Sequence, residues 1–225
     1  MVKGGCNLIN VDWPINQKIC ELEMLQNFLG DMKIEKVLEI GTFFGGTALL
    51  WAKMVEKYNG KVFCVDLQFD WNIVSPYTNR VDFIKHANGN SRDLNLKNFD
   101  VLRYNQVYKG TQWEKYITEL EGNSYDLDFK TKVKTIVGKV DILFIDGDHS
   151  YQGVKDDFYS YSDLVKPNGY IVLHDILDTP HHRECGCFVH ELWAELKSKY
   201  HTVEFLDPVD HFSMGIGVVS RGVRQ

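Results

Sequence analysis

The chain lacks an excess of positive charge and a long apolar run. Its 225 residues include 25 Lys and Arg against 31 Asp and Glu, so its net charge of -6 does not favour a nucleic-acid backbone. No apolar run approaches the roughly 18 residues of a membrane span, and residues 1–6 have no apolar core of a signal peptide. We therefore expect neither a nucleic-acid partner nor a membrane partner.

Paired cysteines are also absent. Five cysteines occur at irregular spacing, and an odd number without a pattern does not make a disulfide framework. Cys185 and Cys187 are one residue apart and no second pair matches them, so we interpret them as loop thiols rather than a zinc site. This usage predicts a reducing compartment, and we expect a cytoplasmic protein.

Internal repeats, low-complexity tracts and linkers are absent too. Residues 1–225 are therefore expected to form a single domain, with 44% hydrophobic residues to build its core. The expected partner is a small-molecule substrate, and a homodimer is compatible with the sequence.

Apolar periodicity predicts strands that alternate with helices. Strands are expected at 36–41, 61–66, 106–110, 140–146, 170–175, 202–206 and 214–219. Helices are expected at 14–30, 46–58, 151–165 and 187–199, with a further helix from Gln112. Residues 121–133 are polar and predict a loop, whereas 68–104 form an insert that is expected to shape the substrate site. The alternation indicates an α/β fold with a mostly parallel sheet and helices on both faces.

The segment 37–47 is the most informative part of the chain. A buried strand end is followed by a turn with Gly41, Gly45 and Gly46, and then by an apolar helix. Glycines let a ligand approach the backbone, and the N–H groups at a helix start point toward it. The next strand ends in Asp66, whose carboxylate can accept hydrogen bonds from both hydroxyls of a ribose. Together these features predict a cofactor with a nucleoside part.

Glu39 distinguishes between such cofactors. A carboxylate beside the turn repels a pyrophosphate, but it suits a cationic ligand such as S-adenosylmethionine (SAM). The turn also lacks the third glycine of a dinucleotide-binding loop. Two alternatives to a SAM-dependent enzyme stay open, namely an NAD-dependent oxidoreductase and a catalytically silent protein of the same fold.

Acidic residues end three of the predicted strands: Asp66, Asp146 and Asp175. Because the carboxyl ends of parallel strands meet at one edge of a sheet, these acids are expected to lie close together. Oxygen ligands suit Mg²⁺, and such a cation stabilises the alkoxide formed from a substrate hydroxyl. His149 follows Asp146 and Asp148 in a short loop, and its titration near neutral pH suits a catalytic base. The competing interpretations are helix-capping acids and a structural histidine in the loop.

Three segments, 37–47, 144–151 and 166–175, together resemble class I SAM-dependent methyltransferases. The resemblance is to small-molecule O-methyltransferases with an Asp-Gly-Asp-His-Ser-Tyr signature, whose relatives include macrocin and sugar O-methyltransferases and cephalosporin-hydroxylase-like proteins. It covers roughly residues 34–219. It implies a Rossmann-like fold with a mostly parallel seven-stranded sheet and an antiparallel terminal strand. It also implies methyl transfer to a hydroxyl of a small molecule such as a sugar or glycoside.

The resemblance further implies roles for individual residues. The implied SAM-binding residues are Glu39, Gly41, Thr42, Phe44, Gly45, Asp66, Gly110, Thr111, Asp146 and Asp148. Asp146 and Asp175 match two metal ligands of cation-dependent relatives, which implies a site for Mg²⁺ or another divalent cation. The third ligand of those relatives is replaced by Ile176, so a metal would need His174, Asp148 or another side chain in that place, and His174 is included among the candidate ligands. His149 stands where those relatives have a lysine base, and it is the expected catalytic residue.

Overall fold

The computed structural model describes residues 13, 15–67, 106–207 and 214–223 of the chain. The insert expected at 68–104 lies outside the described residues. Within these ranges no helix is long and apolar enough to cross a membrane.

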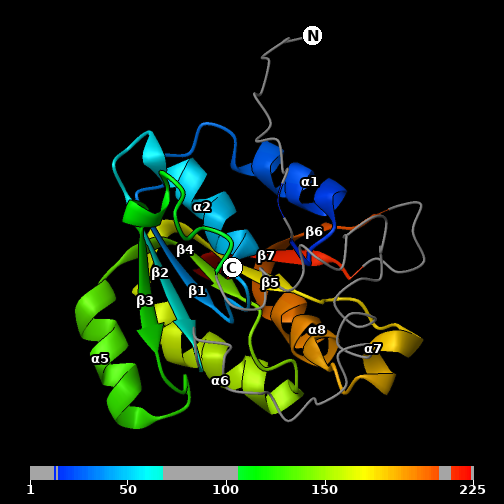
Figure 1. The fold of residues 1–225 in the computed structure, drawn as a ribbon. Coiled ribbons are helices and arrows are strands. Elements are labelled where there is room, and N and C mark those ends of the chain that lie inside the picture. The colour runs from blue at the N-terminus through cyan, green and yellow to red at the C-terminus, as the bar shows by residue number, and fades with distance from the viewer. Residues whose placement is uncertain (1–12, 14, 68–105, 208–213, 224–225) are drawn as a thin grey trace, which may run out of the picture.

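The described residues form one seven-stranded sheet (Figure 1). In spatial order its strands are β3 (Ile117–Glu121), β2 (Lys61–Asp66), β1 (Lys36–Ile40), β4 (Val140–Ile145), β5 (Val165–His174), β7 (Ile216–Val223) and β6 (Tyr200–Phe205). The strands from β3 to β5 are parallel, whereas β7 pairs antiparallel with both β5 and β6. The predicted fold class, a mostly parallel seven-stranded sheet with an antiparallel terminal strand, is confirmed.

Helices cover both faces of this sheet, as Figure 1 shows. One face packs against α1 (Ile19–Leu29) and α2 (Gly46–Glu56), and the other against α5 (Leu127–Val137), α6 (Tyr151–Tyr161) and α8 (Val189–Lys199). A short helix α7 (Pro180–Glu184) precedes α8, and two 3-10 helices lie at Glu114–Tyr116 and Ser162–Leu164. With apolar cores on both faces, every residue of the central strand β4 is buried, which explains its nearly continuous apolar sequence.

The predicted third strand at 106–110 and the helix expected from Gln112 are both wrong. Residues 107–110 form turns, and the third strand is β3, after one 3-10 turn. Tyr108 is buried, but it packs under the loop that follows β1, and the Val107 N–H donates to the Phe44 carbonyl oxygen at 2.9 Å. The apolar residues of this segment therefore serve loop packing, which a strand pattern does not distinguish from strand packing.

The loop predicted at 121–133 is also wrong, because α5 begins at Leu127. The Asp126 carboxylate accepts a hydrogen bond from the Phe129 N–H at 2.8 Å and caps this helix. Only Val133 and Val137 are buried on α5, so its apolar stripe is too sparse to reveal a helix. The strand predicted at 170–175 begins earlier, since β5 starts at Val165, and a register irregularity against β4 accommodates the added residues.

Several predicted element ends also differ from the structure. Of the segment predicted as a helix at 14–30, only Ile19–Leu29 is helical, and the helix predicted at 151–165 ends at Tyr161 with a 3-10 turn after it. These shifts leave the order of the central elements unchanged.

Candidate active site

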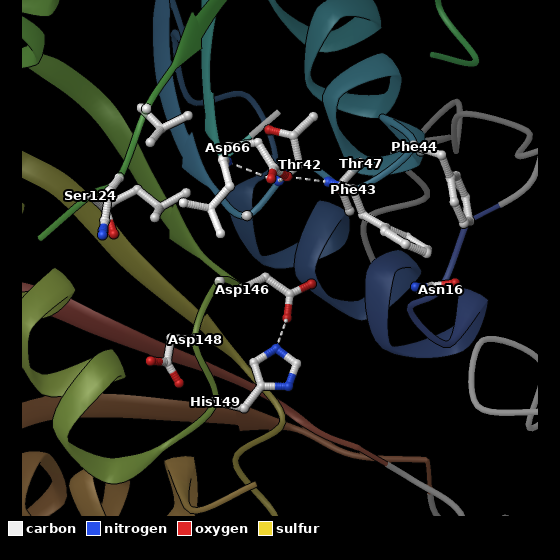
Figure 2. Close-up of a pocket in the computed structure, with 18 of the residues that line it drawn as sticks. Asn16, Thr42, Phe43, Phe44, Thr47, Asp66, Ser124, Asp146, Asp148 and His149 are labelled. Atoms are coloured by element: carbon white, nitrogen blue, oxygen red, sulfur yellow. Dashed lines mark hydrogen bonds and ion pairs between the residues drawn. The ribbon is translucent and has the colours of Figure 1, made fainter. Parts of the chain in front are cut away.

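A cavity of about 510 Å³ opens at the carboxyl edge of the parallel strands (Figure 2). Its walls come from the loops after β1, β2, β3 and β4, and from the residues before α1. The lining residues are 16–17, 40–44, 46–47, 65–67, 122–125 and 146–149. In Figure 2, Asp66 and Thr42 lie on one side of this space, and Asp146 and His149 lie on the other.

The glycine turn after β1 has a backbone that only glycine fits at Gly41. Its φ angle is +83°, and a Cβ atom there would lie 2.1 Å from the carbonyl oxygen of Asp146. The turn therefore packs directly on the end of β4, and the Asp146 N–H donates to the Ile40 carbonyl oxygen at 2.8 Å. The glycine turn and the loop after β4 thus share one backbone contact at the cavity floor.

Asp66 holds this turn from the neighbouring strand. Its Oδ2 atom accepts hydrogen bonds from the N–H groups of Thr42 at 2.9 Å and Phe43 at 2.8 Å, both drawn as dashed lines in Figure 2. Its Oδ1 atom accepts from the Leu67 N–H at 2.7 Å. The carboxylate thus lines the cavity and organises the glycine turn, and its contact with a ribose remains a prediction.

Glu39 lies beneath the glycine turn and does not line the cavity. Its side chain is fully buried and accepts hydrogen bonds from the Thr47 hydroxyl and, at 3.4 Å, from the Cys64 thiol. Burial raises the pKa of Glu39 to about 8, although these two donors act in the opposite direction. The carboxyl group is therefore largely neutral at pH 7 until a positive charge enters the cavity.

Two acids and three histidines form a second group at the sheet edge, which we call the Asp–His cluster: Asp146, His149, His174, Asp175 and His182. The His149 Nε2 atom lies 3.2 Å from Asp146 Oδ1, and its Nδ1 atom lies 3.2 Å from Asp175 Oδ2. The His174 Nδ1 atom lies 3.1 Å from Asp146 Oδ1 and 3.3 Å from Asp175 Oδ1. The His182 Nε2 atom lies 3.5 Å from Asp175 Oδ1.

The topology explains how these residues meet. Asp146 follows β4 and Asp175 follows β5, which are neighbouring strands, and Asp175 adopts a φ of +60° that is uncommon for a residue with a side chain. The His149 carbonyl oxygen accepts a hydrogen bond from the Phe188 N–H at 2.7 Å, which ties the loop after β4 to the start of α8. His182 comes from α7.

Mutual ion pairing sets the protonation of the cluster. Burial alone would lower the pKa of His149, but the carboxylates of Asp175 and Asp146 outweigh it and raise the pKa to about 9. Burial alone would raise the pKa of Asp146, but His174 and His149 outweigh it and lower the pKa. Without a bound cation, His149 is therefore protonated at neutral pH, and it can accept a proton only after losing its own.

The predicted cofactor residues divide into three groups. Gly41, Thr42, Phe44, Asp66, Asp146 and Asp148 line the cavity, whereas Glu39 and Gly45 lie in or under the glycine turn without lining it. Gly110 and Thr111 lie before β3 instead of after it, and they are not among the lining residues. Their polar groups bond locally: the Gly110 N–H donates to Glu114 Oε2 at 2.8 Å, and the Thr111 hydroxyl to the Tyr108 carbonyl oxygen at 2.7 Å.

Several lining residues were missed by sequence reasoning. The residues that follow the true third strand are 122–125, in the place expected of Gly110 and Thr111. Gln17 donates from its Nε2 atom to Asp146 Oδ2 at 2.5 Å across 129 residues of sequence. His182 does not line the cavity but belongs to the Asp–His cluster, and it comes from α7, a segment without clear strand or helix periodicity. A correct placement of β3 would have indicated 122–125, but no local signal marks Gln17.

Comparisons with known proteins identify a methyltransferase domain in this chain. Residues 38–176 match the family model described as Methyltransferase domain. A viral relative, the uncharacterized protein R132 of Acanthamoeba polyphaga mimivirus, is 34% identical over 90 residues. This stretch covers 40% of the chain and 41% of that protein, so the match spans about two fifths of the relative's length.

Solved O-methyltransferase structures share the fold. An O-methyltransferase from Bacillus cereus in complex with S-adenosylhomocysteine (SAH) has a TM-score of 0.55 at 15% identity, covering 97% of this chain and 85% of its own. TomG from Streptomyces achromogenes, in complex with SAM, has a TM-score of 0.54 at 14% identity, and the match covers 88% of this chain and 78% of TomG. MycE of the mycinamycin pathway, with Mg, SAH and mycinamycin VI, has a TM-score of 0.52 at 15% identity, and the match covers 90% of this chain and 48% of MycE. At these identities the likeness is one of fold.

Proposed function

Because the chain belongs to the Methyltransferase-domain family, we propose that it transfers a methyl group from SAM to a hydroxyl of a small molecule. One observation carries the proposal: a single cavity has the Asp66-anchored glycine turn on one side, and Asp146 with His149 on the other. The first side has the features of a nucleoside-cofactor site, and the second has an acid–base pair where a substrate hydroxyl would lose its proton.

The glycine turn fits SAM through its backbone and its buried acid. Gly41 lines the cavity and has no side chain, so a ligand can reach the backbone at that position. Residues 41–44 would contact the methionine part, Asp66 the ribose, and residues 122–125 the adenine. Glu39 beneath the turn favours the sulfonium of SAM over the pyrophosphate of NAD, which argues against the oxidoreductase alternative.

Methyl transfer to oxygen requires a deprotonated hydroxyl in line with the sulfonium methyl group. His149, held between Asp146 and Asp175 at the open side of the cluster, is the proposed base. A divalent cation bound by Asp146 and Asp175 would stabilise the alkoxide. The two carboxylates would orient the histidine ring, and the loop tied to Phe188 would keep it at the cavity wall.

The proposed acceptor is a polyhydroxylated molecule such as a sugar or glycoside. Asn16, Gln17 and Asp148 line the cavity and offer hydrogen-bonding groups to several hydroxyls.

Thermal unfolding with SAM, SAH and NAD tests the cofactor, followed by SAH release with a panel of sugars, glycosides and catechols. At a concentration of 100 times its Kd, a ligand of the folded state adds about 2.7 kcal/mol to the free energy of unfolding. We expect this for SAM and SAH and not for NAD. Stabilisation by NAD alone would contradict the proposal. SAM binding without SAH formation from any acceptor would favour the catalytically silent alternative.

Glu39 predicts a pH dependence that separates SAM from SAH. Below its pKa of about 8 the carboxyl group is neutral and attracts the sulfonium weakly, whereas above it the carboxylate attracts the sulfonium fully. The affinity for SAM, relative to that for the uncharged SAH, should therefore rise by up to about tenfold between pH 6 and 9. Calorimetry across this range measures the ratio, and Glu39→Gln should make it flat. A ratio that keeps its slope in Glu39→Gln would show that another group is responsible.

A further inference from the structure

We propose that the Asp–His cluster binds a borderline transition-metal ion, such as Mn²⁺, Fe²⁺, Co²⁺ or Zn²⁺, through Asp146, His174 and Asp175, in preference to Mg²⁺. The inference concerns the same site as the proposed function. It rests on that function for the role of the ion, which would stabilise the deprotonated substrate hydroxyl. It narrows the expectation of Mg²⁺ or another divalent cation to the second of these.

The chemistry of the donors disagrees with magnesium. Mg²⁺ prefers oxygen ligands and binds few protein nitrogens, whereas imidazole suits Zn²⁺, Fe²⁺ and related ions. Here the two carboxylates contact nitrogen atoms of three rings, and the position after Asp175 is the buried, apolar Ile176. A second group of potential ligands, His149, Asp175 and Cys187, adds a sulfur atom at the same place. The side chains around Asp175 are thus richer in nitrogen and sulfur than a magnesium site.

The spacing of the donors matches a coordination shell. A metal with bonds of about 2.1 Å places adjacent ligand atoms about 3.0 Å apart in an octahedron and about 3.4 Å apart in a tetrahedron. The His174 Nδ1 atom lies 3.1 Å from Asp146 Oδ1 and 3.3 Å from Asp175 Oδ1. All three ligand atoms lie within 4.8 Å of one another, so one ion can reach them together.

Hydrogen bonds alone explain the arrangement of these nitrogen and oxygen atoms less well than a shared metal ion does. The His174 Nδ1 atom carries at most one hydrogen, yet it faces two carboxylate oxygens at nearly equal distances. Those two oxygens also face second rings, since His149 Nε2 lies 3.2 Å from Asp146 Oδ1 and His182 Nε2 lies 3.5 Å from Asp175 Oδ1. Nitrogen and oxygen atoms therefore converge on a common centre, which is the arrangement of ligands rather than of separate pairs.

Burial and exposure divide the roles within the cluster. The residues His174 and Asp175 are only 3% and 5% exposed, so the centre between them is shielded from water. The His149 side chain is 39% exposed and faces the cavity, where it remains available for proton transfer. The ion would then lie beside the base and next to Asp146, which lines the substrate space.

Calorimetry with Co²⁺ and with Mg²⁺ on the full chain, without SAM, tests the inference. A site with a nitrogen ligand binds Co²⁺ more tightly than Mg²⁺, so a difference in affinity alone decides little. The decisive quantity is the change in each affinity caused by His174→Asn, which replaces a nitrogen ligand by an oxygen ligand. We expect Co²⁺ binding to weaken by at least about tenfold, which is the cost of losing even an outer-shell partner of a metal site, whereas Mg²⁺ binding should change much less because Mg²⁺ prefers oxygen ligands. The visible absorption of bound Co²⁺ should change as well. His201→Asn, on the exposed face of β6, is the matched control and should alter neither.

Each outcome decides the question. A Co²⁺ affinity unchanged in a folded His174→Asn protein would overturn the inference, as would equal losses for both ions. SAM titrated into the same samples separates the two proposals. Binding of SAM without any metal binding overturns the inference and leaves the cofactor assignment standing. Metal binding without SAM binding would contradict the cofactor assignment and leave the inference about the metal standing.

Discussion

Asp66→Ala is expected to weaken SAM binding by about 2–4 kcal/mol, or roughly 30–1000-fold, because two charge-assisted hydrogen bonds to the ribose are lost. The loss should fall in the upper part of this range, because the same carboxylate holds the N–H groups of Thr42 and Phe43 in the glycine turn. Isothermal calorimetry with SAM and SAH measures the change.

Two further variants isolate the cause. Glu121→Gln removes an exposed carboxylate from the paired position on β3 and should leave the affinity unchanged. Asp66→Asn keeps an oxygen acceptor for the turn but removes the charge, so it should bind SAM more tightly than Asp66→Ala. Native SAM affinity in a folded Asp66→Ala protein would rule out the ribose contact.

His149→Ala is expected to lower turnover by about 10²–10⁴-fold, the usual contribution of a general base, with little change in SAM affinity. Steady-state kinetics under saturating SAM, together with calorimetry, separates the two quantities. His190→Ala removes another histidine, on α8 outside the cavity, and should keep native turnover.

The pH profile adds a second measurement of the same role. Since the pKa of His149 is about 9 without a cation, turnover in metal-free protein should rise with pH up to about that value. A bound cation repels the protonated ring and should move the inflection to lower pH. Near-native turnover of His149→Ala on both sides of the inflection would assign the histidine a structural role only.

The central strands could be predicted because their sequences are compatible with few other structures. Residues 140–145 form an almost continuous apolar run, and the glycine turn separates β1 from α2 sharply. The edge of the sheet could not be predicted as well. β3 buries only Leu120 and α5 buries only two residues, so half-exposed elements there resemble loops, whereas the buried Tyr108 in a loop resembles a strand.

The residues of the cavity and the Asp–His cluster also divide into those that the sequence could predict and those that it could not. Asp66, Asp146 and Asp175 could be expected at one edge because each ends a parallel strand, and the structure brings them there. Gln17 and His182 could not, because their positions depend on how α1 and α7 pack, which no local pattern records. Gly110 and Thr111 were misplaced through a single error in strand assignment.

The contact between Gly41 and the Asp146 carbonyl oxygen has a consequence for how such an enzyme can diverge. At this contact the spacing between the glycine turn and the loop that carries His149 is set by backbone packed on backbone. Asn16 comes from the segment before α1 and takes no part in this contact. Acceptor preference can therefore change by substitutions of this wall residue, while the two loops keep their spacing. An engineer seeking a new acceptor should vary Asn16 and leave the glycine turn untouched.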